Sequence, residues 1–124
     1  MIVEIERIKQ TSDETIDYAL TVFKIYTDKK VTLQNASELT TLLSALISGG
    51  ALKIVINMKS MNTIDSAGIG ILINCAKLIR KNKGDIVLCG VAPEINEVLN
   101  VVRLEKFVKI FATEVEAVNS FRYL

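Results

Sequence analysis

Residues 52–90 read LKIVINMKSMNTIDSAGIGILINCAKLIRKNKGDIVLCG. Two short, almost entirely apolar runs, 52–56 and 86–89, are typical of strands that are buried on both faces, as parallel strands under helices usually are. Between them, residues 69–83 carry apolar side chains on most of a helical circumference and end at Gly84. A strand, a helix and a strand in this order form a right-handed crossover between parallel strands, which predicts an α/β fold.

The segments before this unit add two strands and a helix. Residues 2–8 alternate apolar and charged side chains, and residues 18–26 are rich in β-branched and aromatic ones, so we expect two antiparallel strands. Residues 35–50 predict an amphipathic helix, with Asn35 as its N-cap, Glu38 as the reciprocal carboxylate and a glycine pair at its end.

The segments after it complete the domain. They predict a short helix opened by Pro93, a strand at 107–111 and a closing helix that Thr113 caps together with Glu116. We therefore expect a single domain over residues 1–124. It would be a mixed sheet of about four to five strands, with helices packed mainly on one face.

The composition is that of a soluble globular protein, with 50% hydrophobic and 23% charged residues. A formal net charge of +1 argues against direct nucleic-acid binding, because that requires a basic face. No apolar run reaches the roughly 20 residues that cross a bilayer, and no secretory signal is visible, so we expect a cytoplasmic protein without a membrane span. Cys75 and Cys89 lie in apolar segments and are predicted to be buried, reduced thiols.

The one segment with candidate chemistry is Asp65-Ser66-Ala67-Gly68-Ile69-Gly70, at the start of the predicted central helix. Asp65 and Ser66 can both cap a helix, so one interpretation gives them only a structural role. In the other, Ser66 is a phosphoacceptor, because a phosphate at a helix N-terminus adds about −1.5 to −2 charges without melting the helix. The two glycines would cost about 1 kcal/mol each in a helix interior, which either tight internal packing or the close approach of a partner could offset.

Known catalytic and nucleotide-binding patterns are absent from the sequence. The chain has no histidine, which excludes a Ser-His-Asp triad. The segment Gly68-Ile69-Gly70 lacks the span and the lysine of a P-loop, and it lacks the third glycine of a dinucleotide fingerprint. We therefore predict no catalytic residue, no cofactor and no metal site, and expect that the chain is not an enzyme.

Residues 65–70 resemble the Asp-Ser-(Ser/Thr/Ala)-Gly-hydrophobic-Gly motif of the STAS family, specifically of its small bacterial anti-sigma factor antagonists. Residues 87–93, VLCGVAP, and residues 110–117, IFATEVEA, are similar to further segments of the family in order and spacing. The resemblance covers roughly residues 18–121 and implies the STAS-like sandwich.

The resemblance also implies a partner-switching function. The unphosphorylated domain would bind an anti-sigma factor that is also a serine kinase, and so free a sigma factor for transcription. The kinase would phosphorylate Ser66 and release the domain, and a metal-dependent serine phosphatase would reset it. Nucleotide and magnesium would belong to the kinase, not to this chain.

The partner surface is expected on loops at neighbouring strand ends, residues 28–34, 62–69 and 90–93. Its candidate residues are Asp28, Asn62, Thr63, Asp65, Ser66, Ala67, Gly68, Ile69, Gly90 and Pro93. The family usually has Gly-Glu-Leu-Asp in the first of these loops, whereas this chain reads TDKKVT at 27–32, with Asp28 as an approximate counterpart.

Two other functions are compatible with the sequence. The chain could be a non-phosphorylated scaffold or interaction domain of a sensor or transporter assembly, or a domain that holds a nucleotide or lipid, and fold alone does not decide between them.

Four basic residues gather at the end of the predicted central helix, Lys77, Arg80, Lys81 and Lys83. This basic cluster fits either a solvated helix end or a contact for an acidic partner.

Overall fold

The computed structural model describes residues 1–8 and 18–122, so the polar residues 10–17, between the two predicted N-terminal strands, lie outside the described residues. The strands are β1 (Ile2–Arg7), β2 (Thr21–Tyr26), β3 (Lys30–Val31), β4 (Lys53–Asn57), β5 (Thr63–Ile64), β6 (Asp85–Cys89) and β7 (Lys109–Phe111). The α-helices are α1 (Ala36–Ser48), α2 (Ser66–Lys81), α3 (Pro93–Val101) and α4 (Glu114–Asn119). Two short 3-10 helices are η1 (Tyr18–Leu20) and η2 (Leu104–Lys106).

A five-stranded mixed sheet in the order β1-β2-β4-β6-β7 forms the centre of the molecule. β1 runs antiparallel to β2, with Ile2 opposite Tyr26 and Arg7 opposite Thr21. β2, β4, β6 and β7 run parallel to one another. The short strands β3 and β5 form a separate parallel pair that the sequence did not predict. The predicted mixed sheet, with its antiparallel first pair, is confirmed.

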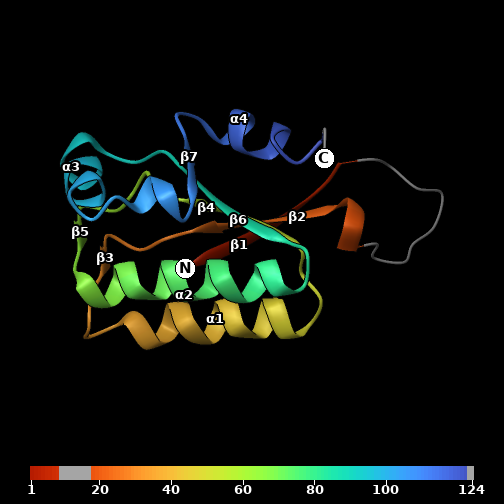
Figure 1. Cartoon of the computed structure of the whole chain (residues 1–124), viewed down its shortest axis with the longest axis horizontal. Coiled ribbons are helices and arrows are strands. Elements are labelled where there is room, and N and C mark those ends of the chain that lie inside the picture. The colour runs from red at the N-terminus through yellow and green to blue at the C-terminus, as the bar shows by residue number, and fades with distance from the viewer. Residues whose placement is uncertain (9–17, 123–124) are drawn as a thin grey trace.

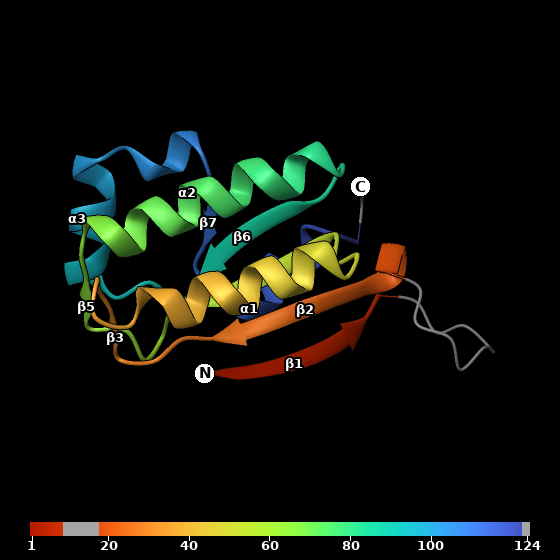
Figure 2. The same cartoon turned by 90° about the horizontal axis from the view of Figure 1, so that it is seen from below.

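Helices cover the two faces of the sheet unequally. The two longest, α1 and α2, pack side by side on one face, and the short α4 lies on the other (Figures 1 and 2). Along β4, Ile54 and Ile56 join the main core cluster, while Val55 joins a second cluster with Val118 and Phe121 from the α4 side. Because side chains alternate across a strand, the apolar middle of this central strand, residues 54–56, is buried on both faces. The predicted placement of the helices, mainly on one face, is confirmed.

The start of α1 differs from the sequence prediction. Asn35 precedes the helix, but its side chain makes no capping hydrogen bond. Its Oδ1 accepts from the Thr32 N–H at 2.9 Å, and its Nδ2 donates to the Lys30 carbonyl at 2.6 Å. The capping box with Glu38 is therefore wrong, since Asn35 instead closes the loop between β3 and α1.

The C-terminal elements follow the prediction more closely. The last strand is shorter than predicted, because the N–H groups of Phe107 and Val108 donate to the Leu104 carbonyl at 2.8 and 3.0 Å and leave only β7. Thr113 caps α4 as expected, with its Oγ1 accepting a hydrogen bond from the Glu116 N–H at 3.2 Å.

The C-terminal end of α2 carries local backbone strain. Lys83 has a φ of 65°, and the N–H groups of Lys83 and Gly84 donate to the carbonyls of Arg80 and Ile79 at 3.0 Å. This is the Schellman pattern, in which the left-handed residue is usually glycine. Gly84 comes one residue later, where a Cβ would lie 2.4 Å from the Leu52 carbonyl oxygen. Gly84 is therefore required for close packing, and Lys83 occupies the strained position.

Lys83→Gly is expected to raise the free energy of unfolding by about 1 kcal/mol, because glycine adopts positive φ without a Cβ clash. Lys83→Ala removes the same charge but keeps a Cβ, so its stability should stay within about 0.5 kcal/mol of the parent. Urea denaturation of the three proteins measures the difference. Equal stability of the glycine and alanine variants would contradict strain at this position.

Candidate functional site

The candidate site is built around the short sheet β3–β5. This pairing sets Val31 beside Ile64, and the Asn62 N–H donates to the Lys29 carbonyl at 2.7 Å. The chain leaving β2 is thereby held against the chain leaving β4, at the end of the molecule where α2 begins (Figures 1 and 2). The start of α2 consequently lies against the loop between β3 and α1.

Asp65 joins that loop to α2 through its carboxylate. Its Oδ1 accepts a hydrogen bond from the Gly68 N–H at 3.1 Å and caps the helix, while its Oδ2 accepts one from the Leu33 N–H at 2.9 Å. These two backbone donors stabilise the ionised form, so they hold the pKa of Asp65 below its usual value. A negative charge is therefore fixed one residue before Ser66.

Ser66 is the first residue of α2, and its side chain is exposed. Because Asp65 provides the cap, the helix does not require the Ser66 hydroxyl for that purpose. The positive end of the helix dipole lies next to this hydroxyl, while the Gly68 N–H of the first turn already donates to Asp65. A group attached to the Ser66 oxygen would stand at the surface, close to the helix N-terminus and to the Asp65 carboxylate.

The two glycines of the motif have different surroundings. A Cβ on Gly68 would lie 2.6 Å from the Val31 carbonyl oxygen and 2.9 Å from Cγ1 of Ile64, so β3 and β5 close this position. A Cβ on Gly70 would meet nothing within 4 Å. Gly70 lies four residues after Ser66 and thus on the same side of α2. Tight packing explains why residue 68 is a glycine. Packing among the described residues does not explain why residue 70 is one.

The other residues of this stretch divide into exposed and buried ones. Asn62 and Thr63 are exposed, and the Thr63 hydroxyl donates to the Asn62 side-chain carbonyl at 3.0 Å. Ala67 is half-buried. Ile69 belongs to the main core cluster, so the structure places it beneath the surface and not among the residues that a partner can touch directly.

Leu33 is a candidate contact residue that the sequence analysis did not single out. Its side chain is 79% exposed, while its backbone N–H is held by Asp65. In the sequence, a large apolar residue in a mostly polar loop was the feature that could have indicated Leu33 as a contact residue. Its position beside the start of α2 depends on the β3–β5 pair, whose two-residue strands are too short to be recognised in a sequence.

Three predicted partner residues lie at other strand ends. Asp28 follows β2, forms an ion pair with the Met1 amino group at 3.3 Å and lines an open cavity of about 330 Å³. Gly90 follows β6 with a φ of 68°, and Pro93 is the exposed first residue of α3. Within the described part of the chain, no hydrogen bond connects these three residues to the 62–69 segment.

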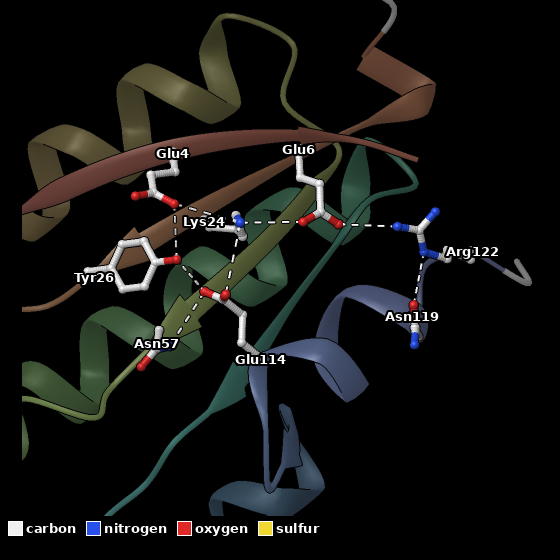
Figure 3. A network of polar contacts seen from close by, with 8 residues as sticks. All are labelled: Glu4, Glu6, Lys24, Tyr26, Asn57, Glu114, Asn119 and Arg122. Carbon is white, nitrogen blue, oxygen red and sulfur yellow. Dashed lines mark hydrogen bonds and ion pairs between the residues drawn. The ribbon is translucent and has the colours of Figure 1, made fainter. Parts of the chain in front are cut away.

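A polar cluster on the α4 side of the sheet was not predicted (Figure 3). Lys24 Nζ lies 3.4, 3.7 and 3.9 Å from carboxylate oxygens of Glu6, Glu4 and Glu114. The Tyr26 hydroxyl donates to Glu114 at 2.5 Å. The pKa of Tyr26 is raised, mainly by burial and secondly by this hydrogen bond. The cluster fixes the first residue of α4 to β1 and β2, and it was missed because its members are far apart in the sequence.

Half of the basic cluster at the end of α2 takes part in internal contacts. Arg80 Nε lies 3.2 Å from an Asp85 carboxylate oxygen, and its guanidinium also donates to the Phe107 carbonyl. Lys77 Nζ lies 5.6 Å from the centre of the Phe107 ring. These two side chains help to pack the end of α2 against the segment before β7.

Cys75 and Cys89 are free and buried, as predicted, and burial raises the pKa of both thiols, to about 11 in Cys89. Across residues 1–8 and 18–122, none of the helices combines the length and apolarity that a bilayer crossing requires.

Comparison with known proteins gives a family match. The STAS domain family model matches residues 11–117 of the chain. The anti-sigma F factor antagonist of Paenibacillus polymyxa is 33% identical over 64 residues, which make up 52% of this chain and 55% of that protein. The chain spans little more than half the length of the curated relatives that it matches first.

Solved structures share the fold. The crystal structure of TM1081 from Thermotoga maritima has a TM-score of 0.78 and 24% identity, with 88% of this chain and 92% of that chain covered. The anti-sigma factor antagonist SpoIIAA in its unphosphorylated form has a TM-score of 0.65 and 17% identity, with 99% and 100% covered. Its phosphorylated form, from Bacillus, has a TM-score of 0.61 and 18% identity, with 96% and 98% covered. Since the family match extends over residues 11–117 and these solved domains have the same sandwich architecture, the chain belongs to the STAS domain family.

Proposed function

We propose that this STAS domain is an anti-sigma factor antagonist that changes partners according to the phosphorylation of Ser66. The unphosphorylated domain binds an anti-sigma factor that is also a serine kinase, and so frees a sigma factor for transcription. The kinase then phosphorylates Ser66, the complex dissociates, and a serine phosphatase restores the hydroxyl. The observation that carries the proposal is the exposed position of Ser66 at the start of α2, next to an ionised Asp65.

Charge provides the physical mechanism. A phosphate on Ser66 adds about −1.5 to −2 charges beside the Asp65 carboxylate. The positive end of the helix dipole favours an anion at this place, and Asp65, not Ser66, caps the helix, so α2 is expected to stay folded. A partner surface that accepts a neutral hydroxyl would have to desolvate these charges, so phosphorylation weakens docking without changing the fold.

The relatives support this mechanism. The Paenibacillus polymyxa protein bears the name of an anti-sigma F factor antagonist, and SpoIIAA has been solved both without and with its phosphate. Both forms of SpoIIAA match the architecture of this chain. A switch that alters the surface and leaves the architecture intact agrees with that pair of structures.

The proposed partner surface lies where the parallel strands end. Its predicted members are Asp28, Asn62, Thr63, Asp65, Ser66, Ala67, Gly68, Ile69, Gly90 and Pro93. We add the exposed Leu33, which lies in the predicted loop 28–34, and Gly70. In this proposal the exposed members touch the partner, while the buried Gly68 and Ile69 support them from below. Leu33 supplies an apolar anchor next to the charge-sensitive Ser66.

In this proposal the chain is a cytoplasmic binding protein and not an enzyme. The nucleotide and magnesium belong to the kinase, and the phosphatase acts from another chain. The domain works on proteins, without direct contact to nucleic acid or membrane. The formal net charge of +1 supports the absence of direct nucleic-acid binding, because nucleic-acid binders present a strongly basic face.

Incubation with ATP and a candidate anti-sigma factor kinase from the same organism tests the proposal directly. Intact-mass measurement and phosphosite mapping should find a single phosphate, on Ser66, and none on a Ser66→Ala variant. Phosphate at another residue, or no phosphate at all, would instead favour a scaffold that is not switched by phosphorylation.

Ser66→Asp is expected to weaken binding of the anti-sigma factor by at least about tenfold, or ~1.4 kcal/mol, because it places a permanent charge beside Asp65. Ser66→Asn has nearly the same shape without the charge and should bind like Ser66→Ala, close to the parent. Isothermal titration calorimetry compares the four proteins. Equal weakening by Asp and Asn would mean that side-chain size, and not charge, controls docking.

The glycines provide a second, matched pair of variants. Gly70→Ala should leave the fold intact or stabilise it by up to about 1 kcal/mol, yet weaken partner binding by at least about tenfold if the partner approaches α2 closely there. Gly68→Ala should instead destabilise the fold by about 1–3 kcal/mol, because its Cβ would overlap β3. Denaturation and calorimetry separate the two effects. Unchanged binding by Gly70→Ala would remove Gly70 from the partner surface.

Asp65→Ala removes the acceptor for the Leu33 and Gly68 amides. Hydrogen exchange at these two amides, followed by NMR, should accelerate well beyond that of neighbouring amides. Asp28→Ala removes a carboxylate of the same chemistry from a neighbouring loop and should leave both amides unaffected. Unchanged protection in Asp65→Ala would show that the loop does not depend on this carboxylate.

A further inference from the structure

The exposed apolar side chains of the described chain are concentrated on β1. Of the ten large hydrophobic residues that are exposed, four lie within the first five positions. These are Met1, Ile2 at 63%, Val3 at 37% and Ile5 at 55% exposure. The exposure of Met1 lies mainly in its main chain, because its side chain is only 9% exposed, so the apolar surface of β1 consists of Ile2, Val3 and Ile5. Single exposed hydrophobic residues are common, but a contiguous group of this kind marks a contact surface.

β1 is also an edge strand. It pairs with β2 on one side only, and no other strand in the described ranges pairs with its outer edge. Neither α1 nor α2 covers it, as Figure 2 shows from the side of these helices. An uncovered edge strand with apolar side chains on both faces presents free N–H and C=O groups together with a hydrophobic surface, which is a template for another strand.

The two acidic residues of β1 have cationic partners within the chain. Glu4 and Glu6 approach Lys24 at 3.7 and 3.4 Å, and Glu6 also approaches Arg122 at 3.2 Å. Lys24 is shared with Glu114, at 3.9 Å, so the balance of charge is partial. A strand that docks on the outer edge therefore meets acidic side chains whose charge is partly offset by Lys24 and Arg122.

We propose that the outer edge of β1 pairs antiparallel with β1 of a second copy of this chain, about a two-fold axis that passes by Val3. The two five-stranded sheets then form one continuous sheet. This contact depends on β1 and not on Ser66, although the Met1 amino group at its end pairs with Asp28 of the proposed partner surface.

The register follows from side-chain parity and charge. Residues opposite each other in an antiparallel pair point to the same face, so odd residues must oppose odd ones and even residues even ones. An axis at Glu4 sets Glu4 against its own copy, and an axis at Ile5 sets Glu4 against Glu6. Like charges directly opposite each other are destabilising.

An axis at Val3 avoids both like-charge pairs. Val3 then lies opposite Val3, and Met1 opposite Ile5, so that these three side chains form one apolar row with their copies. On the other face Ile2 lies opposite Glu4. The exposed side chains of Ile2, Val3 and Ile5 thus gain cover from a second copy, because the pattern of β1 is complementary to itself in this register.

Cysteine variants test the register. Val3→Cys should form a disulfide-linked dimer in a glutathione redox buffer, because opposite Cα atoms lie about 4.5–5.5 Å apart in an antiparallel pair and a disulfide spans that distance. Ile5→Cys is the control, since in this register its copies lie too far apart. Ile5 is more exposed than Val3, so disulfides formed by random collision would appear faster in Ile5→Cys than in Val3→Cys. The native Cys75 and Cys89 are buried.

Sedimentation velocity of the unmodified chain measures the association itself. A dimer that appears with rising concentration is expected, and Ile5→Lys should weaken it at least about tenfold by placing a charge in the apolar row. Val101→Lys changes an 83% exposed valine on α3 and should leave the dimer unchanged. A monomer at all concentrations, or disulfide formation by Ile5→Cys equal to that of Val3→Cys, would overturn the proposal.

Discussion

The carboxylate of Asp65 holds the functional end of the molecule together. One oxygen caps α2 through the Gly68 N–H, and the other binds the Leu33 N–H in a loop 32 residues earlier in the chain. A single side chain thus performs the capping for which Ser66 was also a candidate. Because Asp65 caps α2, the helix does not need the hydroxyl of Ser66 as a cap, and Ser66 is exposed at the surface.

The direction of the parallel strands determines where Asp65 and Ser66 lie in the molecule. β2, β4 and β6 all end at the same edge, so the segments that follow them converge there, and the small β3–β5 sheet draws two of them together. Gly68 allows α2 to approach this small sheet closely, since any side chain would overlap the Val31 carbonyl. The same geometry supports a rigid surface on which one added phosphate changes the charge but not the packing.

The two proposed contact surfaces depend on different physics. Around Ser66 the surface is polar, with one exposed leucine, and its affinity for a partner would respond to charge. Along β1 it is apolar, with free main-chain groups and acids already paired to Lys24 and Arg122. Docking there would respond to hydrophobic burial and strand register, and little to phosphorylation. One small domain could therefore hold a second copy and a switched partner at the same time.

Sequence alone determined the order and type of the main elements, the mixed sheet and the motif at the start of α2. It could do so because a buried parallel strand is apolar throughout and an amphipathic helix has its own period, both of which are local properties. Tertiary structure alone decided which of two good caps binds the helix, why Gly68 and Gly70 differ, and that Lys83 takes the strained conformation expected of a glycine. Each of these depends on a contact with a segment far away in the chain, and no local pattern contains that information.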